Sequence, residues 1–247
     1  MAADVVYFNS DYHKNAFLNA LPGFTGMFPD FQPSGAKDFI FKKSKTLPLG
    51  LNLKRLDSFK ENRDSGPAVI LWNHRWEYDK NPDGFFKVLF QLKEVGTPFK
   101  LVVLGESYKQ TPDIFEKAKQ NLNEEILHFG YAESFEVYAK WLWKSDILPV
   151  TSYQDFFGIS AVEAMYCEVY PLLPNRLAFP GHIPEEEQYE FLYDSENDLF
   201  EKLNWACQNI DQIRKKQKCR NFVAHYDWSI FSSLYDRHLG KDLMPEW

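Results

Sequence analysis

The chain has 247 residues, of which 45% are hydrophobic and 26% are charged, and its formal net charge at pH 7 is −7. This length suits one large domain or two small ones, and the composition is ordinary for a globular protein. The negative net charge argues against a surface built wholly around the phosphate backbone of a nucleic acid. The aromatic share of 17% favours thick cores and flat stacking surfaces without naming a ligand.

Cysteine usage and hydropathy indicate a soluble, cytoplasmic protein. Cys167, Cys207 and Cys219 are widely spaced and form no Cys-x-x-Cys pair, which argues against a disulfide framework and against a structural zinc site. Reduced thiols fit a cytosolic protein. No apolar run approaches the length of a membrane span, and the first residues do not form a signal peptide. We therefore expect no membrane partner.

The first part of the chain is irregular in its pattern. Residues 5–8 predict a strand and residues 13–18 a short helix, and the run that follows carries Pro22, Pro29 and Pro33 before Pro48. One strand and one helix cannot bury a core. We expect this segment either to dock onto the second domain or to be the tail of another domain.

From Ala68 onward, apolar strand-like runs alternate with helices that carry start signals. Asn81-Pro82-Asp83 opens one helix, with Asn as the cap and Pro at the first helical position. This alternation predicts an α/β fold with a Rossmann-like parallel sheet covered on both faces. The predicted strands cover residues 68–72, 100–104, 126–129, 146–150 and 169–173; the predicted helices cover 81–96, a stretch from 111 onward, 134–144 and 158–167, and three more follow from about 195, the last over 228–239.

Ligands of such sheets bind outside the carboxyl ends of the strands. The predicted site therefore lies in three loops, at residues 74–80, 105–108 and 152–158. The chain contains no Gly-x-Gly-x-x-Gly, no phosphate loop, no His-Glu-x-x-His and no Gly-x-Ser-x-Gly. These absences argue against dinucleotide dehydrogenases, P-loop enzymes, zincins and serine hydrolases.

The strongest positive signal is a pair of acids around a helix start. Asp155 precedes a helix that begins with Gly158, and Glu163 lies inside it. The free N–H groups of a helix N-terminus suit a diphosphate, and carboxylates accept hydrogen bonds from sugar hydroxyls. Arg75 and Lys80 can supply the cations that a diphosphate needs. The alternative is that Asp155 is a helix-capping acid and Glu163 an ordinary surface acid.

Other residues near the predicted site have two interpretations each. His74 is either a core histidine at a strand end or a donor to phosphate or sugar oxygens, and its neighbour Arg75 favours the donor. Trp76 either stacks on a base or seals the loop against the sheet, and sealing is favoured. Basic clusters at residues 42–55 and 214–220 are interpreted as solvated side chains rather than as nucleic-acid contacts.

Several pieces resemble the family 4 retaining GT-B glycosyltransferases. Asp155 and Glu163, with seven residues between them and Ala-Met after the second acid, are similar to the Glu-x7-Glu motif of that family. Residues 47–55 resemble its inter-domain linker, Arg75 and Lys80 its phosphate-binding pair, and residues 101–106 its Val-x-Gly strand. The resemblance implies a GT-B fold in which this chain supplies the nucleotide-sugar-binding C-terminal domain.

A narrower resemblance is to the tRNA-queuosine mannosyltransferases. It rests on residues 72–82, 104–106 and 155–158, with Phe8-Asn-Ser10. It implies transfer of mannose from GDP-mannose to queuosine in an aspartate tRNA, with retention and with no metal or other cofactor. By the same resemblance the residues of the catalytic set are Asp155, Arg75 and Lys80, and those of the donor-binding set are His74, Gly105, Glu106, Phe156, Phe157, Gly158 and Glu163.

The chain departs from the pattern of these enzymes at three places. Asp155 stands for Glu, Glu168 stands for Gly, and Gly181-His182 interrupts a Pro-Glu-Ile pattern. Because each lies near the donor pocket, the identity of the hexose is left open. These enzymes also carry a larger N-terminal domain that holds most of the acceptor site. We therefore interpret residues 1–56 as a remnant of that domain with the linker, and 57–247 as the donor-binding domain with C-terminal helices. Such a chain alone is expected to bind GDP without transferring mannose.

Two other functions stay open on the sequence. One is a family 4 glycosyltransferase that acts on a lipid or polysaccharide acceptor. The other is a non-catalytic module that binds a nucleotide sugar.

Overall fold

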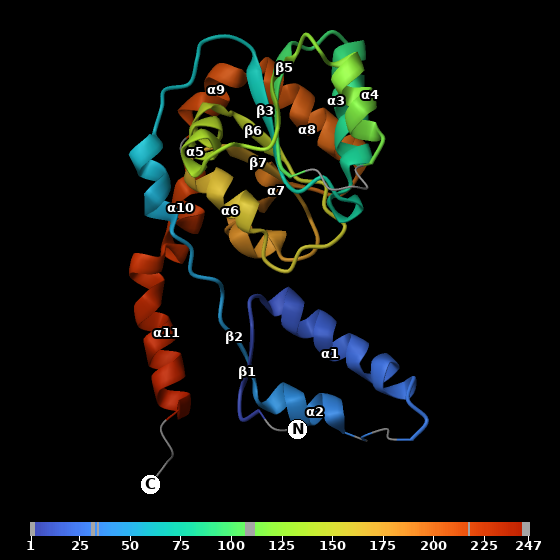
Figure 1. Ribbon diagram of the computed structural model, residues 1–247, viewed down its shortest axis with the longest axis vertical. Coiled ribbons are helices and arrows are strands. Elements are labelled where there is room, and N and C mark those ends of the chain that lie inside the picture. Colours follow the sequence, from blue (N-terminus) through green and yellow to red (C-terminus); the bar gives the residue numbers. More distant parts are fainter. Residues whose placement is uncertain (1–2, 31–32, 34, 107–111, 217, 244–247) are drawn as a thin grey trace.

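The computed structural model describes residues 3–30, 33, 35–106, 112–216 and 218–243. Its centre is a six-stranded sheet in which every pair of neighbours is parallel, so the predicted α/β fold is confirmed (Figure 1). In spatial order the strands are β5 (Ile126–Gly130), β4 (Phe99–Leu104), β3 (Ala68–Asn73), β6 (Ile147–Pro149), β7 (Tyr170–Pro174) and β8 (Leu192–Tyr193).

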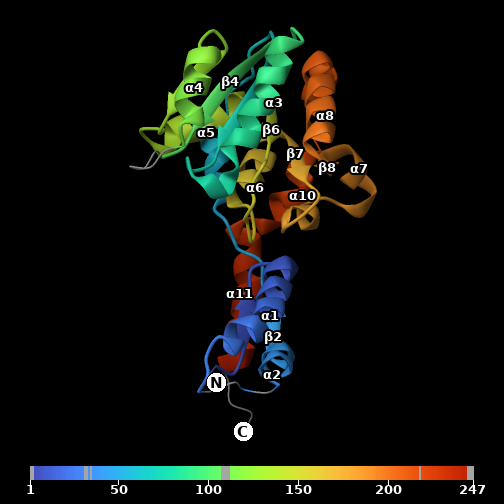
Figure 2. The same cartoon turned by 90° about the vertical axis from the view of Figure 1, so that its right-hand side faces the viewer.

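Helices cover both faces of this sheet, as Figures 1 and 2 show from two sides. One group consists of α3 (Pro82–Glu94), α4 (Ile114–Asn121) and α8 (Glu196–Gln208). In this group α8 packs against β6 and β7. The group on the opposite face consists of α5 (Phe135–Lys144), α6 (Ile159–Tyr166) and α10 (Cys219–Val223).

Side-chain caps fix where these helices begin. Asn81 accepts the N–H of Gly84, Ser134 accepts that of Val137, and Ser195 does the same for α8. Each cap satisfies an N–H that has no partner inside its helix. The start predicted at Asn81 is confirmed. The predicted start at residue 111 lies outside the described residues, and α4 begins at Ile114.

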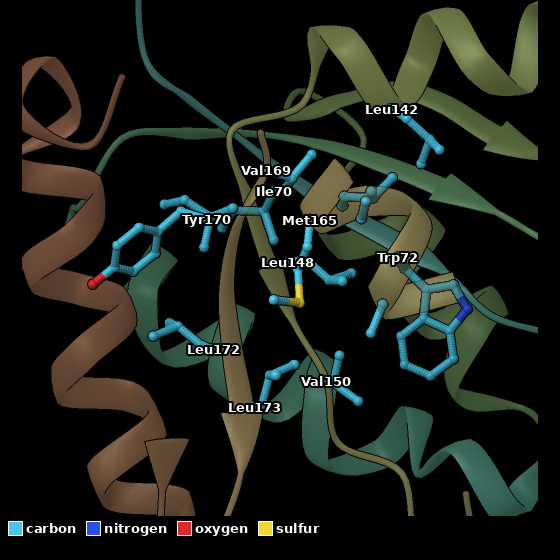
Figure 3. Close-up of a cluster of buried hydrophobic side chains, with 14 of the residues drawn as sticks. Ile70, Trp72, Leu142, Leu148, Val150, Met165, Val169, Tyr170, Leu172 and Leu173 are labelled. Atoms are coloured by element: carbon cyan, nitrogen blue, oxygen red, sulfur yellow. The ribbon is translucent and has the colours of Figure 1, made fainter. Parts of the chain in front are cut away.

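Between the helices, the sheet buries an apolar core. Every residue of β3 is buried, as expected for a parallel strand that is covered on both faces. Figure 3 shows Ile70 of β3 and Leu148 of β6 beside Met165 of α6. Cys167, Cys207 and Cys219 are buried free thiols, in agreement with the spacing of the cysteines.

The N-terminal part contains more helix than we predicted. A two-stranded parallel sheet, β1 (Val6–Phe8) with β2 (Ser44–Thr46), carries α1 (Asp11–Gly26) and α2 (Ala36–Lys42). The predicted irregular run is therefore wrong. Helix α1 continues through Pro22, which is exposed, so the proline ring meets solvent there and removes only one backbone donor from the helix.

The C-terminal part also differs from the three predicted helices. Besides α8 and α10 it contains α9 (Ile210–Lys215) and α11 (Trp228–Leu243), with a 3₁₀ turn η5 (Ala224–Tyr226) before α11. Asn209 ends α8 and starts α9, a break that the apolar periodicity did not reveal. None of the described helices combines the length and apolar character that a membrane-spanning segment needs.

Short elements complete the chain around the edge of the sheet. None of them was predicted; Glu190 of α7, for example, accepts the hydroxyl of Tyr170, which lies 20 residues earlier in the chain. They are η1 (Leu53–Phe59), η2 (Tyr78–Lys80), η3 (Phe179–His182), η4 (Glu185–Glu187) and α7 (Gln188–Phe191).

The linker and the last helix bind each other backbone to backbone. The Leu51 N–H donates to the Tyr226 carbonyl at 2.9 Å, and the Trp228 N–H donates to the Leu51 carbonyl at 2.6 Å. Helix α11 then runs from the six-stranded sheet back beside the β1–β2 part (Figures 1 and 2). This crossing fixes the N-terminal part relative to the sheet.

A buried carboxylate holds the start of the sheet to the C-terminal helices. Asp146 accepts the Val69 N–H at 2.9 Å and both the Nε and Nη2 protons of Arg214, each at 2.9 Å. Arg63 lies 3.5 Å from the same carboxylate. The Asp146 side chain is fully buried, so its charge depends on these partners.

We predict that Asp146→Asn lowers the free energy of unfolding by about 3 kcal/mol, because removing one side of a buried ion pair leaves the arginines uncompensated. Urea denaturation followed by circular dichroism measures the loss. Glu94→Gln, at an exposed acid, is the control and should change stability by less than about 0.5 kcal/mol. Equal stability of the two variants would contradict the assignment.

Candidate functional site

Two adjoining pockets lie at the carboxyl ends of the central strands. The first, which we name the α6 pocket, has a volume of about 450 Å³ and includes the start of α6. The second, the β4 pocket, has a volume of about 360 Å³ and includes the end of β4. They share Asn73, His74 and Arg75, which end β3 and follow it.

All the site residues predicted from the sequence line one or both pockets. Ser107 and Tyr108 of the predicted loop at 105–108 lie outside the described residues. The α6 pocket contains His74, Arg75, Lys80, Asp155, Phe156, Phe157, Gly158 and Glu163, and the β4 pocket contains His74, Arg75, Gly105 and Glu106.

The two predicted cations are held by acids of the same loops. The Arg75 guanidinium pairs with Glu77 at 2.9 Å and is half exposed. Lys80 is mostly buried and lies 3.2 Å from both Asp79 and Asp155. Its ammonium group also donates to the Gln154 carbonyl at 3.0 Å. Lys80 therefore joins the loop after β3 to the loop before α6.

The N-terminus of α6 opens onto the pocket without a capping side chain. Gly158 takes a φ of 86° there, and a Cβ at this position would lie 2.8 Å from the Phe179 ring. Both the left-handed conformation and the contact require glycine. Uncapped N–H groups and the helix dipole attract anions, so this helix start is suited to phosphate oxygens.

Glu163 is not an ordinary surface acid. Its carboxylate accepts the Tyr138 hydroxyl at 2.7 Å, and burial raises the pKa of Glu163. Burial and the neighbouring carboxylate also raise the pKa of Tyr138 well above its usual value. Glu163 lines the α6 pocket and Tyr138 lines the β4 pocket, so this pair stands where the two pockets meet.

His74 is a buried, neutral ring. Its Nδ1 lies 2.9 Å from the Ser160 hydroxyl. Burial is the larger cause, and the positive charge of nearby Lys80 the smaller one, that lowers the pKa of His74 to about 4. Within the described residues, His74 Nε2 and Asn73 Oδ1 are buried without a hydrogen-bond partner. Such groups carry a desolvation cost. The ring combines both interpretations made from the sequence, since it is a core histidine that also lines the site.

Sequence reasoning missed Asn73, Tyr138 and Ser160. Asn73 carried a signal, because a polar residue ending a wholly apolar strand stands at the ligand edge of a parallel sheet. Tyr138 and Ser160 had none, since each acts through a partner 25 and 86 residues away respectively.

Trp76 seals the loop against the sheet, as predicted. Its ring is buried and stacks on Phe115 with a centroid separation of 4.3 Å. Its indole N–H donates to the Leu104 carbonyl at 3.3 Å. The ring therefore belongs to the core and is not free to stack on a base.

The basic cluster at residues 214–220 is consumed by ion pairs. Arg214 binds Asp146, and Lys216 binds Glu190 at 2.9 Å. Arg220 binds Asp57 at 2.8 Å. These side chains are not simply solvated, because they tie the C-terminal helices to the rest of the domain.

Gly105 brings the loops after β3 and β4 into direct contact. Its φ is 132°, and a Cβ there would lie only 2.1 Å from the His74 carbonyl oxygen. The Trp76 N–H donates to the Glu106 carbonyl at 3.2 Å beside it. Only glycine permits this approach, which places Gly105 and Glu106 in the lining of the β4 pocket.

We predict that Gly105→Ala destabilises the protein more than Gly130→Ala does. Gly130 at the end of β5 has a similar φ of 139° with no neighbour within 4 Å, so its variant measures backbone strain alone, about 1–2 kcal/mol. The excess in Gly105→Ala measures the close approach. Thermal unfolding of both variants tests this, and equal losses would mean that the loops can separate freely.

Two family models and a relative of known activity match this chain. Residues 54–222 match the family model of glycosyl transferases group 1, and residues 1–51 match that of the tRNA-queuosine alpha-mannosyltransferase N-terminal region. Over 255 aligned residues, which include the whole chain, it is 34% identical to a tRNA-queuosine alpha-mannosyltransferase of Drosophila melanogaster. It spans 64% of the length of that relative.

Solved structures share the fold at low sequence identity. A glycosyltransferase from Rickettsia africae superposes with a TM-score of 0.75 at 15% identity, over 98% of this chain and 64% of that one. Sucrose-phosphate synthase from Thermosynechococcus elongatus gives 0.70 at 18% identity, over 97% and 59%. Anabaena Alr3699/HepE, solved in complex with UDP, gives 0.71 at 15% identity, over 97% and 64%.

These comparisons confirm the GT-B fold and the resemblance to the tRNA-queuosine mannosyltransferases that the motifs predicted. The family model covers the six-stranded sheet, the β4 pocket and all of the α6 pocket except Asn9 and Leu49. The chain belongs to the glycosyl transferases of group 1.

Proposed function

We propose that this chain carries the donor site of a hexosyltransferase that moves mannose from GDP-mannose to queuosine in aspartate tRNA, with retention of anomeric configuration. The observation that carries the proposal is the meeting of Arg75, Lys80 and the uncapped α6 N-terminus at one pocket. The identity of the donor and of the acceptor rests on the similarity to the Drosophila enzyme and on the N-terminal family match. A tRNA acceptor also agrees with the expected cytoplasmic location.

In this proposal the diphosphate lies between α6 and the two cations. Its oxygens accept the N–H groups at the start of α6, and they replace Glu77 and Asp79 as partners of the cations. During transfer the bond from C1 of mannose to the phosphate oxygen breaks, and a bond from C1 to the acceptor oxygen forms. The acceptor hydroxyl gives up its proton, which passes to the released GDP or to solvent. Negative charge accumulates on the departing GDP, where preorganised cations and dipoles stabilise it. These groups make a metal unnecessary.

The two acids take the sugar parts of the donor. Asp155, mostly buried beside Lys80, accepts hydrogen bonds from the hexose hydroxyls. Glu163, held by Tyr138 at the junction of the pockets, accepts hydrogen bonds from the two ribose hydroxyls. The base then lies in the β4 pocket beside Gly105 and Glu106.

We predict that Arg75→Ala and Lys80→Ala each weaken GDP binding about ten- to a hundredfold, because a charge-assisted contact to phosphate is lost. Isothermal titration calorimetry measures the dissociation constants. Lys87→Ala, at an exposed lysine that pairs with Glu196, is the matched control and should bind as the unaltered chain does. Unchanged affinity in both site variants would place the phosphates elsewhere.

The transfer is tested in the source organism. Deleting the gene that encodes this chain should abolish hexosylated queuosine in tRNA, as measured by mass spectrometry of tRNA nucleosides. A gene copy carrying Lys87→Ala should restore the product, and a copy carrying Arg75→Ala with Lys80→Ala should not. Hexosylated queuosine that persists in the deletion strain would contradict the acceptor assignment. That result would favour a glycosyltransferase with a lipid or polysaccharide acceptor, or a non-catalytic module that binds a nucleotide sugar.

A further inference from the structure

His182 is a buried histidine near the proposed donor site, and no step of the proposed transfer uses it. It ends η3, and its ring is 4% exposed. The ring lines a third pocket, of about 250 Å³, between the N-terminal part and the loop after β7. This pocket shares Phe157 and Asn9 with the α6 pocket. His182 therefore stands directly behind the loop that carries Asp155.

Hydrogen bonds on both ring nitrogens fix the protonation of His182. Nε2 lies 2.5 Å from the Phe157 carbonyl oxygen. A carbonyl can only accept, so Nε2 carries the proton and donates it. Nδ1 lies 3.3 Å from the Tyr226 hydroxyl, which donates to it when the ring is neutral. Burial lowers the pKa of His182 and favours this neutral form.

The backbone of Phe157 connects His182 to Asp155. The Phe157 N–H donates to the Asp155 carboxylate at 3.4 Å, while the carbonyl of the same residue accepts from His182. The Phe157 ring packs edge-on against both His182 and Tyr226, with centroids 5.1 and 5.2 Å away. The N–H and the carbonyl lie on either side of the Phe157 Cα, so the bond from His182 restrains the same stretch of backbone that binds the Asp155 carboxylate.

On its other side, His182 contacts Tyr226, which lies where the linker and the last helix bind each other. Tyr226 is buried, and its carbonyl accepts the Leu51 N–H of the linker at 2.9 Å. A continuous chain of contacts therefore runs from the linker through Tyr226 and His182 to the loop before α6. Arg75 pairs with Glu77, outside this chain of contacts. Lys80 touches Asp155 but is also held by Asp79, on the loop after β3.

We propose that His182 is a positioning residue that holds the 155–158 loop so that Asp155 meets the hexose of the donor. The inference rests on the proposed function. It separates the two halves of donor recognition, because the diphosphate is bound by Arg75, Lys80 and α6, while the hexose is bound by a loop that His182 orients. Loss of His182 should therefore weaken binding of the nucleotide sugar more than binding of the free nucleotide.

The test compares GDP-mannose with GDP by calorimetry. His182→Phe keeps a ring but loses the N–H; it should weaken GDP-mannose binding about three- to tenfold, the effect of one hydrogen bond, and GDP binding less than about twofold. His182→Gln places an amide N–H near the same site and should restore most of the affinity. His225→Phe is the matched control, because it also replaces a histidine that packs on Tyr226, with ring centroids 3.9 Å apart, but His225 is exposed.

The possible results distinguish this inference from the proposed function. An unaltered chain that binds neither ligand would overturn both. An unaltered chain that binds, with His182→Phe weakening both ligands equally or neither, would overturn the positioning role alone. Failure of His182→Gln to restore affinity would show that the ring, and not its N–H, matters.

A second measurement needs no variant. Nitrogen-15 NMR of the imidazole reports its tautomer directly, and the Nε2–H form is expected near neutral pH. An Nδ1–H form or a charged ring would overturn the proposal even if His182→Phe does not fold.

Discussion

The wholly buried strand β3 is the constraint on which the site depends. Its six residues are covered on both faces, and its direction is fixed by β4 on one side and β6 on the other. Immediately beyond the apolar run stand Asn73, His74 and Arg75, which both pockets share. Asn73 and His74 are buried where the loops converge, and among the described residues each keeps one polar atom without a hydrogen-bond partner at this ligand edge of the sheet.

Around that edge, opposite charges hold one another in place before any ligand arrives. Lys80 lies against Asp79 and Asp155, and Arg75 against Glu77. Such pairs hold the cations near the position that a diphosphate would take, which lowers the reorganisation that binding requires. The same acids keep a cluster of positive charge from repelling itself. Within the proposed function, exchange of an acid for a phosphate oxygen is the step that couples donor binding to the loops.

Much of the fold followed from local patterns. The strands at residues 68–72 and 100–104 were predictable because both faces of a parallel strand are buried and the sequence is continuously apolar. Helix starts at Asn81 and Ser134 were predictable because a cap needs one side-chain oxygen at one position. The full length of helix α1 was not predicted, because Pro22 indicates a break. An exposed proline late in a helix is tolerated when the surrounding turns are held by other contacts.

The site was predictable as a set of loops but not as a set of contacts. Asp155, Glu163, Arg75 and Lys80 stand at strand ends and a helix start, which topology brings together. The tyrosine that holds Glu163 and the histidine behind Phe157 are different, because each depends on packing between residues 25 apart in sequence. No local pattern encodes such a pair. Side chains that orient the site therefore had to come from the structure.

In the proposed function one nucleotide sugar occupies both pockets, with its diphosphate at α6. A crystal structure of the chain with GDP-mannose is the sharpest test. We expect phosphate oxygens within hydrogen-bond distance of Arg75, Lys80 and the α6 N–H groups, the ribose at Glu163 and the hexose at Asp155. A nucleotide bound elsewhere, or one whose diphosphate makes no contact with α6, would contradict it.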